Sequence, residues 1–324
     1  MRFPARRSRS GQFRWYPRTA RCRSRRPLGE TDIDPVGSRC AAEKCPLRHA
    51  FLWDAGRMID LGPFLEQEGV DGQANGLNDA GLVVGTYKQA GRGSVGFVFG
   101  ANKRTLISEA ASSRARAINV SGEAVGDFDT GSSESSSHAF AWPSGGTISE
   151  ISVAGGRFEL AAAVNDLGQV AGSFESAGSS VHHAAIYSGG TVIDLGTLGG
   201  MNSDSSAINS VGQVVGSSQL SAGSRHAFLY SDSKMLDLGT LGGLESRANG
   251  INARGQVVGW ATTTAGQQHA VLWRSAEIFD LNAVVALGDD AVLQEATAVN
   301  DAGQIVVNGS NGHAYLITLP AEHR

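Results

Sequence analysis

A short motif recurs along this chain at an almost constant interval, and this repetition restricts the possible folds more than any other feature. The motif begins with His-Ala, continues with an aromatic or apolar residue and ends in an apolar tail. Six clear copies begin at His49, His138, His183, His226, His269 and His313, and a degraded copy begins at Val95. In chain order, the seven copies start 46, 43, 45, 43, 43 and 44 residues apart. Such a period is typical of repeat architectures, in which each unit packs against its neighbours.

A second motif keeps the same period, and residues 251–259 (Ile-Asn-Ala-Arg-Gly-Gln-Val-Val-Gly) are a clean copy. Its asparagine is followed three positions later by glycine. These residues are Asn78 and Gly81, Asn119 and Gly122, Asn165 and Gly168, Asn209 and Gly212, Asn252 and Gly255, and Asn300 and Gly303. Asparagine side chains bond nearby backbone and glycine accepts positive φ, so each Asn-x-x-Gly predicts a tight structural turn.

Each repeat is predicted to contain four short strands. Strand a ends at the asparagine, strand b is the run Gln-Val-Val-Gly, strand c is the His-Ala motif, and strand d ends at Asp-Leu. The β-branched runs are too short for helices, and no segment shows sustained helical periodicity. Four strands per repeat of this length predict an all-β fold, a β-propeller of about six four-stranded blades. A parallel β-solenoid is the alternative.

The strand count leaves one strand c in excess, because the repeats begin with strands c and d and end with a, b and c. We expect strands from both ends of the repeat region to close the ring. The surplus strand then either packs outside the ring or belongs to a blade whose strands a and b have been lost.

Most of the repeated histidines are followed by an acid at the end of strand d. The predicted pairs are His49 with Asp60, His138 with Glu150, His183 with Asp194, His226 with Asp237, and His269 with Asp280. The separation is 11 residues except for His138, where it is 12. An odd separation across a hairpin predicts two residues directly opposite one another on one face, and the 12-residue case needs a bulge or an odd loop. The copy at Val95 has lost its histidine and is expected to carry Ser108 in place of the acid.

We interpret these pairs as structural, holding strands c and d in register. The competing interpretation is that both positions are independent rim residues. A metal site is not expected, because ligands must converge on one ion and the histidines are spread over different blades. We expect no cofactor.

These motifs resemble the HAF repeat family, which is named for its His-Ala-Phe signature, over roughly residues 49–317. The resemblance implies a secreted or surface-exposed bacterial repeat protein. It brings no established activity or catalytic residues. The sequence departs from the family pattern at Val95 and in the third motif, Asp-Leu-Gly-Thr-Leu-Gly-Gly, which is complete only at 194–200 and 237–243.

Charge divides the chain into a head and a body. Residues 1–48 hold 13 basic and 4 acidic residues, a net of +9, whereas residues 49–324 hold 14 and 27, a net of −13. The predicted organisation is a basic segment at 1–48, a repeat domain at 49–319 and a tail at 320–324. The head is interpreted as disordered or non-authentic, with nucleic-acid or lipid binding as alternatives. No apolar stretch suits a signal peptide or a membrane span, and no nucleic acid is expected on the body.

Two functions from different classes fit these observations. The first is a non-enzymatic binding or adhesion scaffold that contacts a glycan or surface protein through the variable loops between strands b and c. These loops are residues 89–94, 130–137, 176–180, 219–224 and 262–268. The second is a propeller-type polysaccharide hydrolase or lyase, which requires a blade with unique polar residues. The best unpaired carboxylates for such a site are Asp127, Asp129, Asp289 and Asp290, and the sequence does not place them together.

Overall fold

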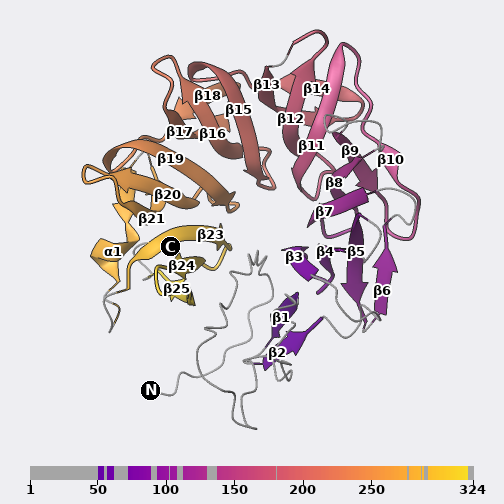
Figure 1. Ribbon diagram of the computed structural model, residues 1–324, viewed down its shortest axis with the longest axis horizontal. Helices are drawn as coiled ribbons and strands as arrows, with labels where there is room; N and C mark the ends of the chain where they lie inside the picture. The colour runs from indigo at the N-terminus through magenta and orange to yellow at the C-terminus, as the bar shows by residue number, and fades with distance from the viewer. Residues whose placement is uncertain are drawn as a thin grey trace, which may run out of the picture.

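The computed structural model shows an all-β protein whose blades follow one another around a common axis (Figure 1). The residues it describes are 50–54, 57–61, 72–88, 93–101, 103–107, 112–129, 137–179, 181–275, 277–285, 287 and 291–319. The predicted segments 1–48 and 320–324, and also His49, lie outside this part of the chain. The prediction of a six-bladed β-propeller is confirmed.

Five blades contain four antiparallel strands each, and their sheets follow the order of the sequence. Blade 1 is β3 (Gly72–Leu77), β4 (Val83–Lys88), β5 (Ser94–Gly100) and β6 (Lys103–Leu106). Blade 2 is β7 (Ser112–Ile118), β8 (Ala124–Asp129), β9 (Ser137–Trp142) and β10 (Ser149–Glu150). Blade 3 is β11 (Gly156–Val164), β12 (Val170–Ser176), β13 (His182–Ser188) and β14 (Thr191–Asp194). Blade 4 is β15 (Gly199–Ile208), β16 (Val214–Leu220), β17 (Arg225–Ser231) and β18 (Lys234–Asp237). Blade 5 is β19 (Gly242–Ile251), β20 (Val257–Thr263), β21 (Gln268–Arg274) and β22 (Glu277–Asp280), followed by the short helix α1 (Leu281–Val284).

Blade 6 has three strands in the described chain: β23 (Leu293–Val299), β24 (Gln304–Gly309) and β25 (Ala314–Thr318). The surplus strand c is β1 (Phe51–Asp54), which pairs with β2 (Arg57–Asp60) in a separate two-stranded sheet. The expectation that strands from both ends share one blade is therefore wrong for the described residues. Because every paired strand is antiparallel, the solenoid alternative is also excluded.

The β1–β2 hairpin lies where the outer half of a preceding blade would lie. Ala50 and Leu61 join the apolar cluster of blade 1, which includes Phe97. The equivalent residues of blade 3, Ala184 and Leu195, pack in the same way against blade 4. The hairpin thus covers one face of blade 1, as a complete neighbour does elsewhere in the ring.

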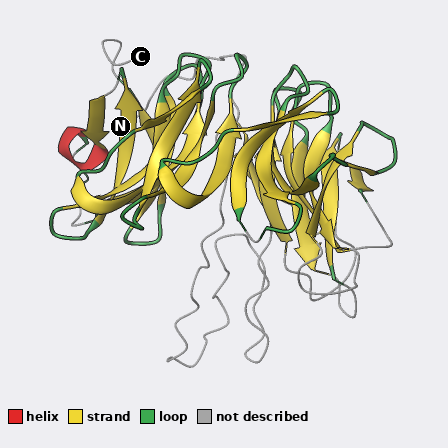
Figure 2. Ribbon diagram, turned by 90° about the horizontal axis from the view of Figure 1, so that it is seen from above, coloured by secondary structure: helices red, strands yellow, loops and turns green. Residues whose placement is uncertain are grey.

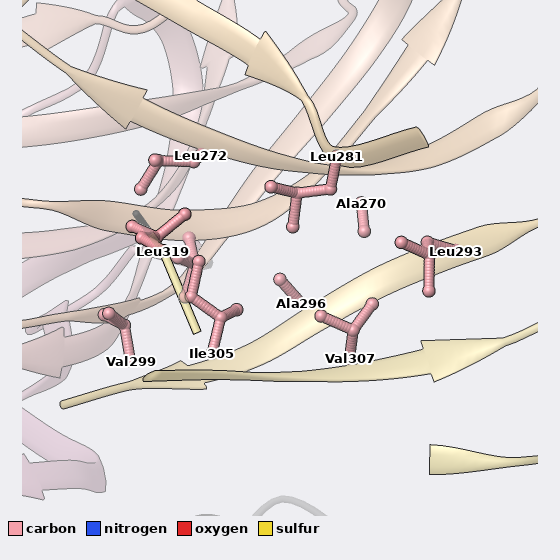
Figure 3. Packing of buried hydrophobic residues seen from close by; sticks show 10 residues of the cluster. Ala270, Leu272, Leu281, Leu293, Ala296, Val299, Ile305, Val307 and Leu319 are labelled. Atoms are coloured by element: carbon pink, nitrogen blue, oxygen red, sulfur yellow. The ribbon is translucent and has the colours of Figure 1, made fainter. Parts of the chain in front are cut away.

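Apolar packing between successive blades forms the core. Figure 3 shows one such interface, where Ala270 and Leu272 of blade 5 share one apolar cluster with Leu293 and Ile305 of blade 6. Val307 stands where the other blades have the terminal glycine of strand b, and it is fully buried in this cluster. The inner strands of all six blades line one narrow axial channel.

The strands run up and down between two faces of the disc, which are seen edge-on in Figure 2. We call the side with the Asn turns and the c–d hairpins the turn face. The opposite side, with the b–c loops and the d–a connections, is the loop face. The predicted hairpin turns are formed: the six turn glycines have φ between +73° and +83°. Each asparagine Oδ1 accepts the backbone N–H four residues later, at 2.9–3.0 Å.

Candidate functional site

The asparagines of the turns also bond from one blade to the next. Asn78 Nδ2 donates to the backbone oxygen of Asn119 at 2.8 Å, and the same bond follows from blade 2 to blade 6 at 3.0–3.3 Å. The asparagines are nearly fully buried. Asn300 is the last in the series, and its amide donates within its own turn to Gln304 Oε1 at 2.8 Å. Five bonds therefore link the six blades through a residue expected to serve only its own turn.

On the turn face, next to the axial cavity lined by the inner strands, lies a pocket of about 110 Å³ whose lining includes Asp79, Asp166 and Asp301. Two of these carboxylates already have partners in the preceding blade. Asp166 Oδ1 accepts from the Val120 N–H and Asp301 Oδ1 from the Ala253 N–H, both at 2.9 Å. This acidic opening is therefore part of the contact between blades.

On the loop face, the structure brings four of the five predicted His–acid pairs together. The Nδ1 to carboxylate distance is 2.7 Å for His138 and Glu150, 2.9 Å for His183 and Asp194, 2.9 Å for His226 and Asp237, and 2.7 Å for His269 and Asp280. His49 lies outside the described residues, so the pair with Asp60 is not placed. These pairs are partly exposed, with 16–30% of the histidine side chains accessible.

The predicted register of the pairs is wrong by two residues. Asp237 lies directly opposite Phe228, the third residue of the motif, and His226 reaches it diagonally. The c–d connection of only two residues sets this offset, since Ser231 pairs with Lys234. Diagonal neighbours on one face remain within reach of long side chains. In blade 2 the last pair is Ala141 with Ser149, and the odd number of residues between them, 142–148, accounts for the 12-residue separation.

Three of the aspartates have a second role that the sequence did not indicate. The Oδ1 atoms of Asp194 and Asp237 accept from the Gly196 and Gly239 N–H groups at 2.8 Å. Asp280 caps α1 in the same way, accepting from the Asn282 N–H at 2.9 Å. Each carboxylate therefore joins the start of strand c to the chain leaving strand d.

The copy without histidine also differs from the prediction. Leu106, rather than Ser108, occupies the position of the acid, because it lies opposite Phe97 as Asp237 lies opposite Phe228. Ser108 itself is outside the described residues. Val95 and Leu106 belong to one apolar cluster. Blade 1 has therefore replaced both members of the polar pair with apolar residues.

The strongest departure from the repeat is a row of charged side chains on the loop face of blades 3 and 4, which we call the charged row. It consists of Arg157 and Glu159 of β11, Glu175 of β12, His182 of β13, Asp204 of β15 and Arg225 of β17. Arg157, Glu175 and His182 are cross-strand partners in successive strands. Glu159 is an extra residue in a β-bulge, since Phe158 pairs with Phe174 and Leu160 with Ser173. Bulges re-aim side chains and are common beside functional sites.

The charges of the row alternate and are in contact. Arg157 Nη2 lies 2.5 Å from Glu159 Oε1 and 2.6 Å from Glu175 Oε2. His182 Nε2 lies 3.3 Å from Asp204 Oδ1, and the other oxygen of Asp204 binds Arg225. The row thus crosses from blade 3 to blade 4, and 26–35% of each of these side chains is exposed.

The pKa of Glu159 is raised above its ordinary value. Burial raises the pKa of Glu159, the Arg157 guanidinium opposes this, and the charge and hydrogen bond of Glu175 raise it further. The nearby His182 lowers the pKa of Glu159. Because two carboxyl groups share one guanidinium, proton uptake is easier at this position than at an isolated surface glutamate.

The sequence analysis named four other acids as unpaired carboxylates for a catalytic site. Asp127 is not unpaired: it is 2% exposed and contacts Arg114 at 2.7 Å and Arg116 at 2.5 Å. Asp129 lies opposite Ser112 at the end of blade 2, and Asp289 and Asp290 are outside the described residues. Blade 3, in contrast to blade 1, carries additional charged residues.

A positional comparison could have found only part of the charged row. Three residues after the terminal glycine of strand b stand Glu175 in blade 3, Gln219 in blade 4 and Thr262 in blade 5, but Lys88 and Asp129 give blades 1 and 2 a charge there as well. The residue before the paired histidine is His182 in blade 3, but Gln268 in blade 5. The bulge at Glu159 left no such signal, because nothing in the local sequence marks an extra residue there.

Within the described ranges, no group of three or more His, Cys, Asp or Glu side chains is arranged to hold a metal ion. The one helix in the described part of the chain is far too short to cross a bilayer.

Comparison with known proteins gives distant likeness only. No family model and no curated protein matches the chain. Among solved structures, TolB from Acinetobacter baumannii is similar with a TM-score of 0.47 and 11% identity, over 72% of this chain and 62% of TolB. XC5397 from Xanthomonas campestris, titled a gluconolactonase, is similar with a TM-score of 0.42 and 10% identity, over 76% of this chain and 86% of that protein. Neither likeness indicates what this chain binds or does.

Proposed function

We propose that this chain is a non-enzymatic repeat protein of the HAF type, working outside the cell or at its surface as a binding or adhesion scaffold. Its ligand, a glycan or a surface protein, contacts the loop face. The observation that carries this proposal is the charged row, because it departs from the repeat on the loop face and its side chains reach solvent. Rigid scaffolds commonly place binding residues on the variable side of a repeated frame.

The turn face is less suited to this role. Its asparagines are nearly fully buried in bonds between blades, whereas His182 and Asp204, which join blades 3 and 4 on the loop face, are 35% and 28% exposed. On the loop face, the b–c connections at 220–224 and 263–267 form tight turns, and their backbone hydrogen bonds stay within each turn. Residues there can change without altering contacts between blades.

A glycan array and a panel of cell-surface proteins, probed with labelled protein, test this function. We expect binding that falls at least about tenfold in a variant with both His182→Ala and Arg225→Ala, a loss of about 1.4 kcal/mol. Glu245→Gln, on the loop face of blade 5, is the matched control and should bind normally. Binding that is unaffected by the double variant, despite normal folding by circular dichroism, would contradict the placement of the site.

The second candidate is a polysaccharide hydrolase or lyase, and the Glu159–Glu175 pair favours it. A carboxyl group with a raised pKa, such as Glu159, is suited to act as a general acid. Release of reducing ends or unsaturated products from a polysaccharide panel, abolished by Glu159→Gln, would support this candidate over a binding scaffold.

A further inference from the structure

The charged row contains a local excess of negative charge at its blade 3 end. Glu159 and Glu175 both contact the same nitrogen of Arg157, at 2.5 and 2.6 Å. An arginine pairs most strongly with one carboxylate through two parallel bonds, so two acids on one nitrogen are a poorer arrangement. One of the two acids is therefore exchangeable.

We propose that Arg157 is a carboxylate-binding group for an acidic glycan and that proton uptake by Glu159 releases it for this ligand. The inference rests on the proposed function and adds the chemistry of the ligand. No covalent bond changes: Glu159 takes one proton from solvent, its neutral carboxyl group withdraws from Arg157, and a uronate carboxylate takes its place. The charge around the guanidinium is unchanged by the exchange.

Two observations single out Glu159 rather than Glu175 as the acid that gives way. Glu159 lies on the bulge and is not held by a cross-strand partner, whereas Glu175 pairs with Arg157 on one side and His182 on the other. Burial of Glu159 and the nearby carboxylate of Glu175 both favour the protonated form of Glu159. The groups facing it are Arg157 on its own strand, Glu175 on β12 and His182 on β13. From blade 2, Ser137 of β9 donates only to its backbone oxygen, at 3.2 Å.

The surroundings favour a sugar over an acidic peptide. Asn202 is partly exposed and its Oδ1 accepts the backbone N–H of His182 at 3.2 Å, and the carboxylate of Asp204 is 28% exposed beside it. Amides, hydroxyls and carboxylates are the groups that bind sugar hydroxyls through directed hydrogen bonds. Met201, which is 62% exposed beside Asn202, offers an apolar surface for the face of a sugar ring.

Calorimetric titration with a defined galacturonate oligosaccharide at pH 5 and pH 7.5 tests the proposal. A uronate stays ionised at both values, since carboxyl groups of this kind titrate near pH 3.5. The wild-type protein should bind at least about tenfold more tightly at pH 5. Glu159→Gln should bind at pH 7.5 as the wild type does at pH 5, and Arg157→Gln should not bind at either pH. Glu150→Gln, on the loop face of blade 2, should keep the wild-type pH dependence.

Two further ligands in the same titration test whether the bound carboxylate must belong to a sugar. A neutral galactose oligosaccharide of equal length should bind weakly at both values, and so should a polyglutamate peptide. Preferential binding of the peptide, equal binding of the neutral sugar, or an unchanged pH dependence in Glu159→Gln would each overturn the proposal. If neutral glycans bind and His182→Ala with Arg225→Ala removes that binding, the proposed function stands and this inference fails. If nothing binds the loop face at all, both fail.

Discussion

The bonds between blades lead to a sharp prediction at Asn209. Its Oδ1 accepts from the Gln213 N–H at 2.9 Å, and its Nδ2 donates to Gln213 Oε1 at 2.8 Å and to the Asn252 oxygen at 3.1 Å. Asn209→Asp keeps the acceptor that forms the turn and removes only the donor. The introduced carboxylate then faces two oxygens in a site where Asn209 is 4% exposed.

Loss of a buried hydrogen-bond partner costs about 1–3 kcal/mol, and burial of a carboxylate adds to this cost. We therefore expect the free energy of unfolding to fall by about 3 kcal/mol at pH 7. For a domain of this size that cost lowers the melting temperature by about 6–12 °C in differential scanning calorimetry. Asn311→Asp is the matched control, because Asn311 is exposed and its amide donates to the Tyr315 hydroxyl at 2.7 Å. Its cost should stay below about 1 kcal/mol.

The pH dependence provides a second check on Asn209→Asp. Burial raises the pKa of the introduced carboxyl in the folded state above its unfolded value, so the folded protein binds the proton more tightly. This tighter proton binding stabilises the folded variant at low pH, and the stabilisation is lost as pH rises through the folded-state pKa of the introduced carboxyl. The gap to wild type should therefore be smaller at pH 4 than at pH 7. A gap that is equal or larger at pH 4, or a cost no greater than that of Asn311→Asp, would refute the role assigned to the amide.

Three other outcomes are expected. Gly216→Ala places a Cβ 1.9 Å from the backbone oxygen of Asp204, so strands a and b must separate, and chemical denaturation should show a loss of about 3 kcal/mol. Asp237→Ala removes an exposed pair and should cost no more than about 1 kcal/mol, whereas Asp280→Ala removes a better buried pair and a helix cap and should cost about 1–2 kcal/mol in the same assay. Glu159→Gln should gain stability over wild type as pH rises from 4 to 7, because the raised pKa of Glu159 makes the folded wild type lose stability over that range; a constant difference in urea unfolding would contradict this.

Sequence reasoning succeeded where one local rule acts in every repeat. The blade count and the turns follow from Asn-x-x-Gly and the β-branched run beside it, because each needs only neighbouring residues. The alternation of side chains along each strand correctly placed His226 and Asp237 on one face of the sheet. The register did not follow, since the length of the c–d connection decides which residues lie opposite, and the sequence alone does not show where a strand ends.

Features that depend on two blades were missed. Aspartate serves a tight turn as well as asparagine does, yet all six turn positions hold asparagine. That uniform choice was the available sign of a donor reaching beyond its own turn, as Asn209 does toward Asn252. The charged row was missed for a related reason. Asp204 and Arg225 come from blade 4, and only the ring brings them beside His182.

The two faces of the ring therefore differ in how freely they can change. On the turn face, a substitution at one asparagine breaks a bond to the next blade, so each copy constrains its neighbour. On the loop face, the bonds of the His–acid pairs stay within one blade, and blade 1 shows that both members of a pair can become apolar while the sheet persists. The positions of the His–acid pairs on the loop face can therefore change without breaking a bond to the next blade. The charged row lies there, and the bulge at Glu159 changes one side chain's direction without disturbing the turn of its blade.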